Sequence, residues 1–265
     1  MSQAQVKKST NWVSILTIPA ALIVSILLYI FVFGDPDNFN ADHSPKEGNF
    51  FAIIHEGGVI VPILMTLFLT VFTVVIERLF TVYSAKGTGS LETFLQKVKT
   101  NLNSGQVAAA VADCDKQKGS VANVVRAGLN KYSEMEKDTE LEKEQKVLAI
   151  QKEMEEATSL ELPMLEKNLT IIATLASVST LLGLLGTVVG MIKAFSALGN
   201  SGGSTDASAL ANGISEALVN TALGIGTSAI CIIAYNVFTS KIDELTYSID
   251  EIGLSVNQNY ATHHN

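Results

Sequence analysis

The chain has 265 residues, of which 48% are hydrophobic and only 17% are charged, and its mean hydropathy is +0.32. Soluble domains carry about 25% charged residues, so this composition indicates a membrane protein and argues against a soluble enzyme. The net charge of −8 argues against nucleic-acid binding, which needs a basic face. The two cysteines, Cys114 and Cys231, lie far apart and form neither a metal motif nor a disulfide framework.

Four apolar stretches approach the roughly 20 residues that a helix needs to cross a bilayer. They cover 13–33, 57–76, 169–192 and 209–237, and they are continuous, unlike the alternating strands of a β-barrel. The alternative, buried core helices of a soluble protein, would require more core than one small domain contains. We therefore predict an all-α membrane protein with four transmembrane helices and long helices extending into the cytoplasm.

The first stretch could instead be a signal peptide, because Lys7 and Lys8 precede it. However, 13–33 is longer than the usual apolar region of 7–15 residues, and no cleavage site of the Ala-x-Ala type follows Phe33. We expect a retained helix, with Pro19 as a candidate kink.

Basic residues predict the orientation. With both termini inside, sixteen of the eighteen Lys and Arg residues are cytoplasmic, as the positive-inside rule favours. The predicted segments are 1–12 (cytoplasmic), 13–33 (extra transmembrane helix), 34–56 (periplasmic), 57–76 (transmembrane), 77–168 (cytoplasmic helical domain), 169–195 (transmembrane), 196–208 (periplasmic), 209–237 (transmembrane) and 238–265 (cytoplasmic helical tail).

The long segment 77–168 is predicted to be a series of helices. Ser90 is placed to cap the helix that follows it, and Gly105 and Gly119 interrupt the chain. The stretch 141–167 is dense in good helix formers and contains no glycine. We expect a long helix that runs from it into the third span, interrupted only by Pro163.

Small residues recur at heptad spacing along the last two spans, and such seams let helices approach closely in lipid. Large aliphatic residues continue the fourth seam beyond the membrane, from Phe238 to Val256, as in a coiled coil. We expect one helix from near Asp206 past Val256, and association of several copies; packing within one chain is the alternative. The seam residues are Ala173, Ala176, Thr180, Gly183, Thr187, Gly190 and Ala194 in the third span, and Gly213, Ala217, Asn220, Gly224, Thr227, Cys231 and Ala234 in the fourth.

Glu216 is the one carboxylate in the four apolar stretches. An acidic residue near the centre of a membrane helix costs about 2.5–3.5 kcal/mol, so it usually faces an interior or a water path. Asn220, Thr221 and Thr227 extend a polar stripe from it, which makes this stripe a candidate ion pathway. The alternative is an interfacial glutamate that favours the helix dipole.

Two blocks, GLLGTVVGMIKAF at 183–195 and GISEALVNTALGI at 213–225, closely resemble the MotA/TolQ/ExbB proton channel family, nearest its ExbB and TolQ branches. IERLF at 76–80 resembles the inner end of that family's first span. The resemblance places the family's polar residues at Thr187, Glu216 and Thr221, lining an interior around a partner helix.

Three features depart from the family pattern. Ser179 and Thr180 stand where the family often has Ala-Pro, and Asn220 stands where alanine is common. The span 13–33 is additional to the three-helix family core.

The resemblance implies an inner-membrane subunit, not an enzyme, that converts proton motive force into work on a periplasmic or outer-membrane system such as energised import. It implies a homopentamer around single-span ExbD/TolR-like helices, acting indirectly on a TonB/TolA-like protein. The transported ion would be a proton or sodium, with no cofactor and no bound metal. A membrane scaffold without ion flux, and a flagellar or gliding-type stator subunit, remain alternatives.

Overall fold

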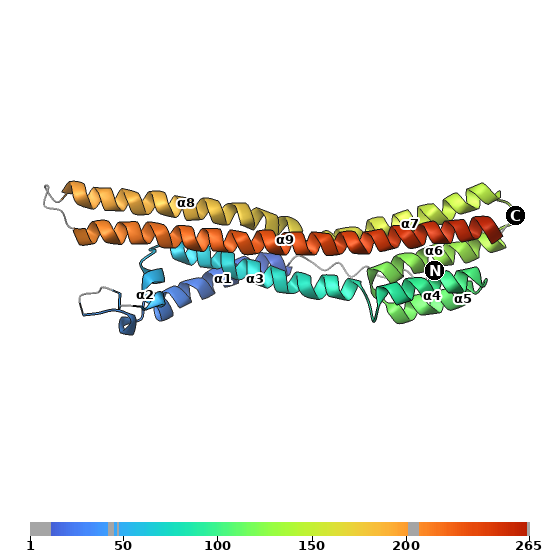
Figure 1. Cartoon of the computed structure of the whole chain (residues 1–265), viewed down its shortest axis with the longest axis horizontal. Coiled ribbons are helices and arrows are strands. Elements are labelled where there is room, and N and C mark those ends of the chain that lie inside the picture. Colours follow the sequence, from blue (N-terminus) through green and yellow to red (C-terminus); the bar gives the residue numbers. More distant parts are fainter. Residues whose placement is uncertain (1–11, 42–44, 47, 201–206, 264–265) are drawn as a thin grey trace. The chain divides into compact units, whose positions relative to one another are not determined.

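The protein is helical throughout the part of the chain that the structure, a computed structural model, describes: residues 12–41, 45, 46, 48–200 and 207–263 (Figure 1). Extended pairing within these residues is limited to an isolated bridge between Phe39 and Pro45. Four of the helices are long and apolar enough to cross a membrane. The predicted class, an all-α membrane protein with four candidate spans, is confirmed.

The helices follow one another with short connections. In chain order they are α1 (Trp12–Leu28), a π-helical turn η1 (Tyr29–Phe33), a 3-10 turn η2 (Pro36–Asn38), α2 (Phe50–His55), α3 (Ile60–Ala85), α4 (Leu91–Asn103), α5 (Val107–Gln117), α6 (Gly119–Lys137), α7 (Lys143–Glu166), α8 (Leu169–Asn200) and α9 (Ala207–His263).

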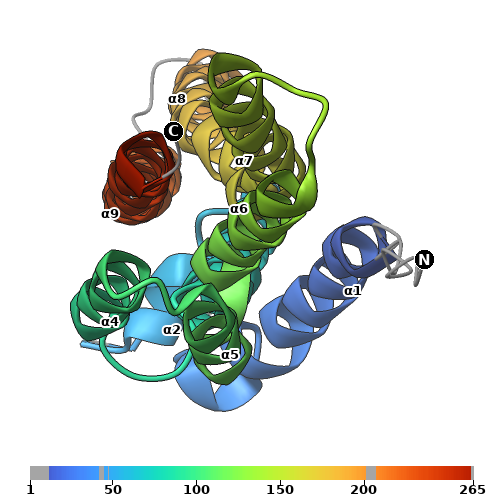
Figure 2. The same ribbon diagram turned by 90° about the vertical axis from the view of Figure 1, so that its right-hand side faces the viewer.

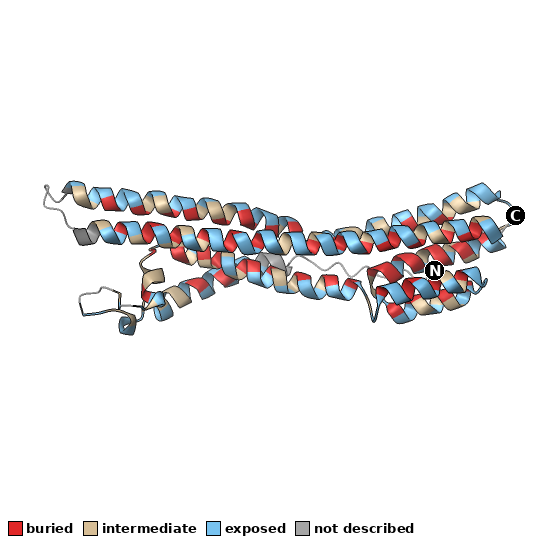
Figure 3. Ribbon diagram, in the orientation of Figure 1, coloured by how far each residue is buried: buried red, intermediate tan, exposed pale blue. Residues whose placement is uncertain are grey.

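The chain divides into two compact units, each made of two segments. The first unit comprises Met1–Ile76 and Ile171–Tyr235, and the second comprises Glu77–Thr170 and Asn236–Asn265. Helices α3, α8 and α9 each contribute residues to both units. In Figure 3 the buried residues of α8 and α9 form stripes, and the other described residues of these helices are exposed or half-buried.

In the first unit, aromatic side chains join η1 and the residues after it to α2. The rings of Tyr29 and His55 stack with their centroids 4.6 Å apart, and the Tyr29 hydroxyl donates to the His55 carbonyl oxygen at 3.1 Å. Phe39 meets the same histidine edge-on at 5.4 Å. Pro19 lies inside α1 without ending it.

In the second unit, consecutive helices from α4 to α7 pack on one another (Figure 2). Ser90 caps α4 as expected, because its hydroxyl accepts from the Thr93 amide at 3.4 Å. Gly105 and Gly119 adopt positive φ, as the predicted breaks require.

The aliphatic seam of α9 from Phe238 to Val256 is covered by helices of the same unit, as the alternative of packing within one chain predicts. Phe238, Ile252 and Val256 are at most 3% exposed. Helices α4 and α6 contact this part of α9: the Tyr132 hydroxyl of α6 donates to Asn259 at 3.0 Å, and Lys99 of α4 pairs with Glu251 at 2.6 Å.

The predicted continuous helix from 141 into the third span is wrong. The chain breaks at Lys167, which has ψ 139°, and at Asn168, which has φ 66°. Pro163 instead lies inside α7. A left-handed residue cannot continue an α-helix, and Asn tolerates that conformation better than most residues do.

Candidate functional site

Helices α8 and α9 approach so closely at several glycines that a side chain at these positions would not fit. A Cβ atom on Gly224 would lie 2.8 Å from Gly183 Cα and 2.6 Å from Ser179 O. A Cβ atom on Gly190 would likewise lie 2.8 Å from Gly213 O. These glycines therefore serve packing within one chain, which was the alternative to their use between chains.

The buried stripe of α8 differs from the predicted seam at alternate positions. Ala176, Gly183 and Gly190 are buried, but Ala173 is exposed, and Thr180 and Thr187 are half-buried. Their places in the stripe are taken by Ile172, Ser179 and Gly186. Positions three and four residues from a seam residue both lie near the partner helix. Ser179 and Gly186 are smaller than Thr180 and Thr187, so they allow the closer approach. On α9, Gly213, Ala217 and Gly224 lie in the buried stripe.

Asn220 of α9 is fully buried between α8 and the residues before α3. Its amide nitrogen donates to Gly57 O at 2.8 Å, and its Oδ1 has no hydrogen-bond partner among the described residues. A Cβ on Gly186 would lie 2.8 Å from the Asn220 Cγ atom, so this position of α8 requires glycine. The asparagine thus fills the space that a small residue leaves open.

Glu216, one turn before Asn220, is 8% exposed and forms an ion pair with Lys193 of α8. The Lys193 Nζ atom lies 2.5 Å from Glu216 Oε1, and the lysine side chain is 52% exposed. Gly58 lies against the same carboxylate: its φ is +71°, and a Cβ there would come within 2.5 Å of Glu216 Oε1. Next to it, Ser215 donates to Glu56 Oε2 at 3.2 Å. We call Glu56, Gly58, Lys193, Ser215 and Glu216 the Glu216 site.

The threonines of the predicted ion pathway use their hydroxyl groups on backbone carbonyls. Thr227 donates to Leu223 O at 2.8 Å and Thr221 donates to Gly183 O at 3.3 Å. Thr187 donates to Leu184 O at 2.5 Å and lies on a shallow, mostly apolar face of α8 that includes Val188, Met191 and Phe195. Within the described residues, no hydrogen bond joins these threonines to Glu216, so their assignment as pore-lining residues stays a prediction.

Sequence reasoning missed four members of the Glu216 site, namely Glu56, Gly58, Lys193 and Ser215. Lys193 lies just beyond the apolar stretch 169–192, and because it precedes Glu216 by 23 residues on a different helix, no helical spacing relates the two. Gly57 and Gly58 stood only as the start of an apolar stretch. The pair of adjacent glycines before a helix was the one available signal for a close backbone approach.

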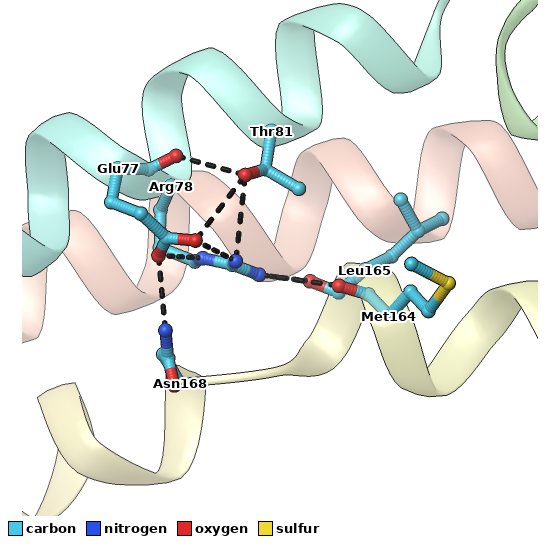
Figure 4. Close-up of polar contacts among 6 residues, drawn as sticks. All are labelled: Glu77, Arg78, Thr81, Met164, Leu165 and Asn168. Carbon is cyan, nitrogen blue, oxygen red and sulfur yellow. Dashed lines mark hydrogen bonds and ion pairs between the residues drawn. The ribbon is translucent and has the colours of Figure 1, made fainter. Parts of the chain in front are cut away.

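A second polar cluster lies in the second unit, around Arg78 at the end of α3 (Figure 4). Arg78 is 1% exposed, and its guanidinium binds Glu77 at 2.7 and 2.5 Å. It also donates to the carbonyl oxygens of Met164 and Leu165, at 3.3 and 3.2 Å. These carbonyls belong to the last turn of α7, where the helix dipole favours a cation.

The same cluster holds the break between α7 and α8. The Asn168 amide donates to Glu77 Oε2 at 3.0 Å, so the left-handed residue is tied to the carboxylate that pairs with Arg78. Thr81 accepts a further bond from the guanidinium at 3.4 Å. This arrangement is a structural clamp, and it explains why the helix that the sequence predicted as continuous is divided at this point.

The helices and the buried polar groups define a multi-pass membrane protein with ionisable side chains inside its apolar segments. Its residues 116–251, about half of the chain, match the model of the MotA/TolQ/ExbB proton channel family. The chain belongs to this family, and within it the resemblance is to the ExbB and TolQ branches. The Glu216 site falls partly within the match, whereas Glu56, Gly58 and the Arg78 side of the clamp precede it.

Curated relatives carry both names. The chain is 44% identical over 90 residues to the putative biopolymer transport protein ExbB-like 3 of Synechocystis, covering 33% of this chain and 42% of that protein. It is 33% identical over 125 residues to the Tol-Pal system protein TolQ of Pseudomonas aeruginosa, covering 47% and 54%. It is 44% identical over 82 residues to the biopolymer transport protein ExbB of Helicobacter pylori, covering 31% and 56%. The matched segments thus span about half the length of these relatives.

Proposed function

We propose that this chain is an ExbB/TolQ-like subunit of an inner-membrane proton channel that converts proton motive force into work on a periplasmic or outer-membrane system, with energised import as the output. The observation that carries the proposal is the buried Glu216 carboxylate, paired with Lys193, in the segment that matches the channel family. An intramembrane carboxylate costs several kcal/mol and is retained where it carries function. One charge crossing 100 mV supplies about 2.3 kcal/mol for such work.

The proposed assembly is a homopentamer with both termini in the cytoplasm, surrounding ExbD/TolR-like single-span helices and acting through a TonB/TolA-like protein. Its ion is a proton or sodium. Thr187, Asn220, Thr221 and Thr227 would line the path with Glu216. Asn220 Oδ1, which is buried without a partner among the described residues, is the acceptor best placed to bind a water or a hydrated proton.

The test is ion flux in vesicles that contain the subunit together with its single-span partner. A relay role predicts that Glu216→Gln and Glu216→Ala both abolish flux while the complex still assembles. An anchor role predicts that the Gln variant conducts and the Ala variant does not. Glu251→Gln is the matched control, because Glu251 is an ion-paired glutamate on the same helix, 2.6 Å from Lys99. Thr187→Val and Thr221→Val test the hydroxyl groups with little change in shape.

A scaffold without ion flux is the second candidate, and one observation favours it. The Glu216 carboxylate and the hydroxyls of Thr187, Thr221 and Thr227 all have partners within the chain, as purely structural groups would. Wild-type energised transport in the Glu216→Gln, Glu216→Ala, Thr187→Val and Thr221→Val variants would establish this reading and contradict the channel.

A further inference from the structure

A groove in the second unit combines apolar and basic side chains. It has a volume of about 260 Å³ and lies between the last turns of α3 and the part of α9 that follows Tyr235. Leu79 and Val82 of α3 line one wall, and Val237 of α9 lines the other. Leu79 is 53% exposed and Val237 is 51% exposed, so this apolar lining is open to its surroundings.

Along each wall, the side chains change from apolar to basic in the direction of the chain. On α3 the lining passes from Leu79 through Tyr83 to Lys86, and on α9 it passes from Val237 to Lys241. Both helices are candidate membrane spans, and these residues lie at or just beyond the ends of the apolar stretches 57–76 and 209–237. The groove is therefore amphiphilic, with an apolar end toward each helix's membrane part and two lysines at the other end.

One carboxylate reduces the charge of the basic end. Glu244 also lines the groove, and its Oε2 atom lies 2.6 Å from Lys241 Nζ. Two lysines and one glutamate leave one net positive charge. Basic residues beside a span on the cytoplasmic side attract the anionic headgroups of that leaflet, and an aromatic residue such as Tyr83 is typical of the membrane interface.

We propose that this groove binds one anionic phospholipid of the cytoplasmic leaflet, with an acyl chain along Leu79, Val82 and Val237 and the headgroup phosphate at Lys86 and Lys241. The proposal rests on the membrane placement of the proposed function, not on ion flux. The groove is smaller than the cavities that enclose a whole small molecule. It therefore takes part of the lipid and leaves the rest in the bilayer. A zwitterionic lipid gains little from one net positive charge, so the site distinguishes headgroups.

The experiment places a tryptophan reporter in the groove of the full chain. Trp12 is the chain's single tryptophan, so Trp12→Phe with Tyr83→Trp gives one reporter at the groove, because Tyr83 is 82% exposed there. Quenching by brominated phosphatidylglycerol is compared with quenching by brominated phosphatidylcholine in mixed vesicles. One net charge near an anionic headgroup predicts a preference of roughly fivefold for phosphatidylglycerol.

Phe80→Trp, also with Trp12→Phe, is the matched control. Phe80 lies on the same helix at nearly the same level, is 74% exposed and does not line the groove. This reporter should be quenched about equally by both lipids. Its quenching by either lipid also shows that the chain is inserted in the bilayer, so failure of membrane placement is distinguished from failure of the groove proposal.

Charge variants of the Tyr83→Trp reporter decide the headgroup site. Lys86→Gln with Lys241→Gln should remove the preference for phosphatidylglycerol, and Glu244→Gln should increase it. Misfolding does not produce two changes of opposite sign. Lys116→Gln with Lys152→Gln should leave the preference unchanged, since each of these lysines pairs with a carboxylate on its own helix outside the groove.

Equal quenching by the two lipids at position 83, or a preference that survives loss of Lys86 and Lys241, would overturn the proposal. Absence of quenching at position 83 beside quenching at position 80 would also overturn it, because the groove would then be covered by protein.

Discussion

Lys193 of α8 and Glu216 of α9 form an ion pair of 2.5 Å that joins the two helices of the family-matched segment within the first unit. The carboxylate is nearly buried, whereas the lysine is half-exposed. Glu216 consequently has a partner inside its own chain before any second copy or partner helix is added. Its role in ion movement would require this pair to open or to exchange partners.

Lys193→Met should lower the free energy of unfolding by about 1 kcal/mol, which is a few degrees in Tm, because it leaves Glu216 with no cation in a buried place. Lys193→Arg should retain most of the stability. Lys193→Met combined with Glu216→Gln should recover part of the loss, since no unpaired charge remains. Thermal unfolding in detergent measures these three variants and the single Glu216→Gln change. Additive effects of the two single changes would contradict the pairing.

Gly224→Ala should destabilise the α8–α9 pair by about 2 kcal/mol, because the new methyl group would meet the backbone of Ser179 and Gly183 at 2.6–2.8 Å. Gly226→Ala is the control on the same helix, two residues away, where a Cβ has nothing within 4 Å. It should be neutral or raise stability by up to about 1 kcal/mol, as helix propensity predicts. Equal unfolding temperatures of the two variants would contradict the close approach.

Arg78→Met should cost about 3 kcal/mol, since it leaves Glu77 and two helix-terminal carbonyls without their cation. It should also increase trypsin cleavage after Lys167, because the clamp holds Asn168. Arg126→Met, which removes an exposed pair with Asp115 at 3.1 Å, should cost under about 1 kcal/mol and leave the cleavage pattern unchanged. An Arg78 variant with wild-type stability and cleavage would show that the cluster does not secure the break.

Gly58→Ala should destabilise the Glu216 site through both a positive φ and a direct contact with the carboxylate. Gly48→Ala separates the two causes, because Gly48 has a similar φ of +77° but open space around it. The Gly58 variant should therefore show the larger drop in Tm. Ion flux in vesicles should fall only in the Gly58 variant. Equal losses in the two variants would assign the whole effect to backbone strain.

The Cys114 thiol should not react with maleimide in the native protein. It is 2% exposed, and burial raises its pKa to about 12 from an ordinary 9. Since the folded pKa is the higher one, the stabilisation of the neutral thiol is fully present below pH 9 and declines as pH rises toward 12. Labelling at pH 8, followed by mass spectrometry, should modify the exposed thiol of Ser104→Cys and leave Cys114 unmodified until the chain is denatured. Rapid modification of native Cys114 would contradict this burial.

The sequence by itself determined the helical class, the four apolar spans, the single long helix Ala207–His263 and the cap at Ser90. These features follow from hydrophobicity and from residues close in sequence, so a pattern reveals them. The GLLGTV and GISEAL blocks likewise carried the family resemblance, because both lie within the segment that the family model matches.

Tertiary structure decided how distant residues meet. The heptad spacing of α8 left positions 179 and 180 almost equivalent, and only the approach of α9 selects Ser179 for burial. The break at Asn168 lies beside Arg78, 90 residues earlier, whose guanidinium donates to the carbonyl oxygens in the last turn of α7. The partners of Glu216 come from α8 and from the glycines before α3, and no local propensity specifies a contact between segments so far apart in the chain.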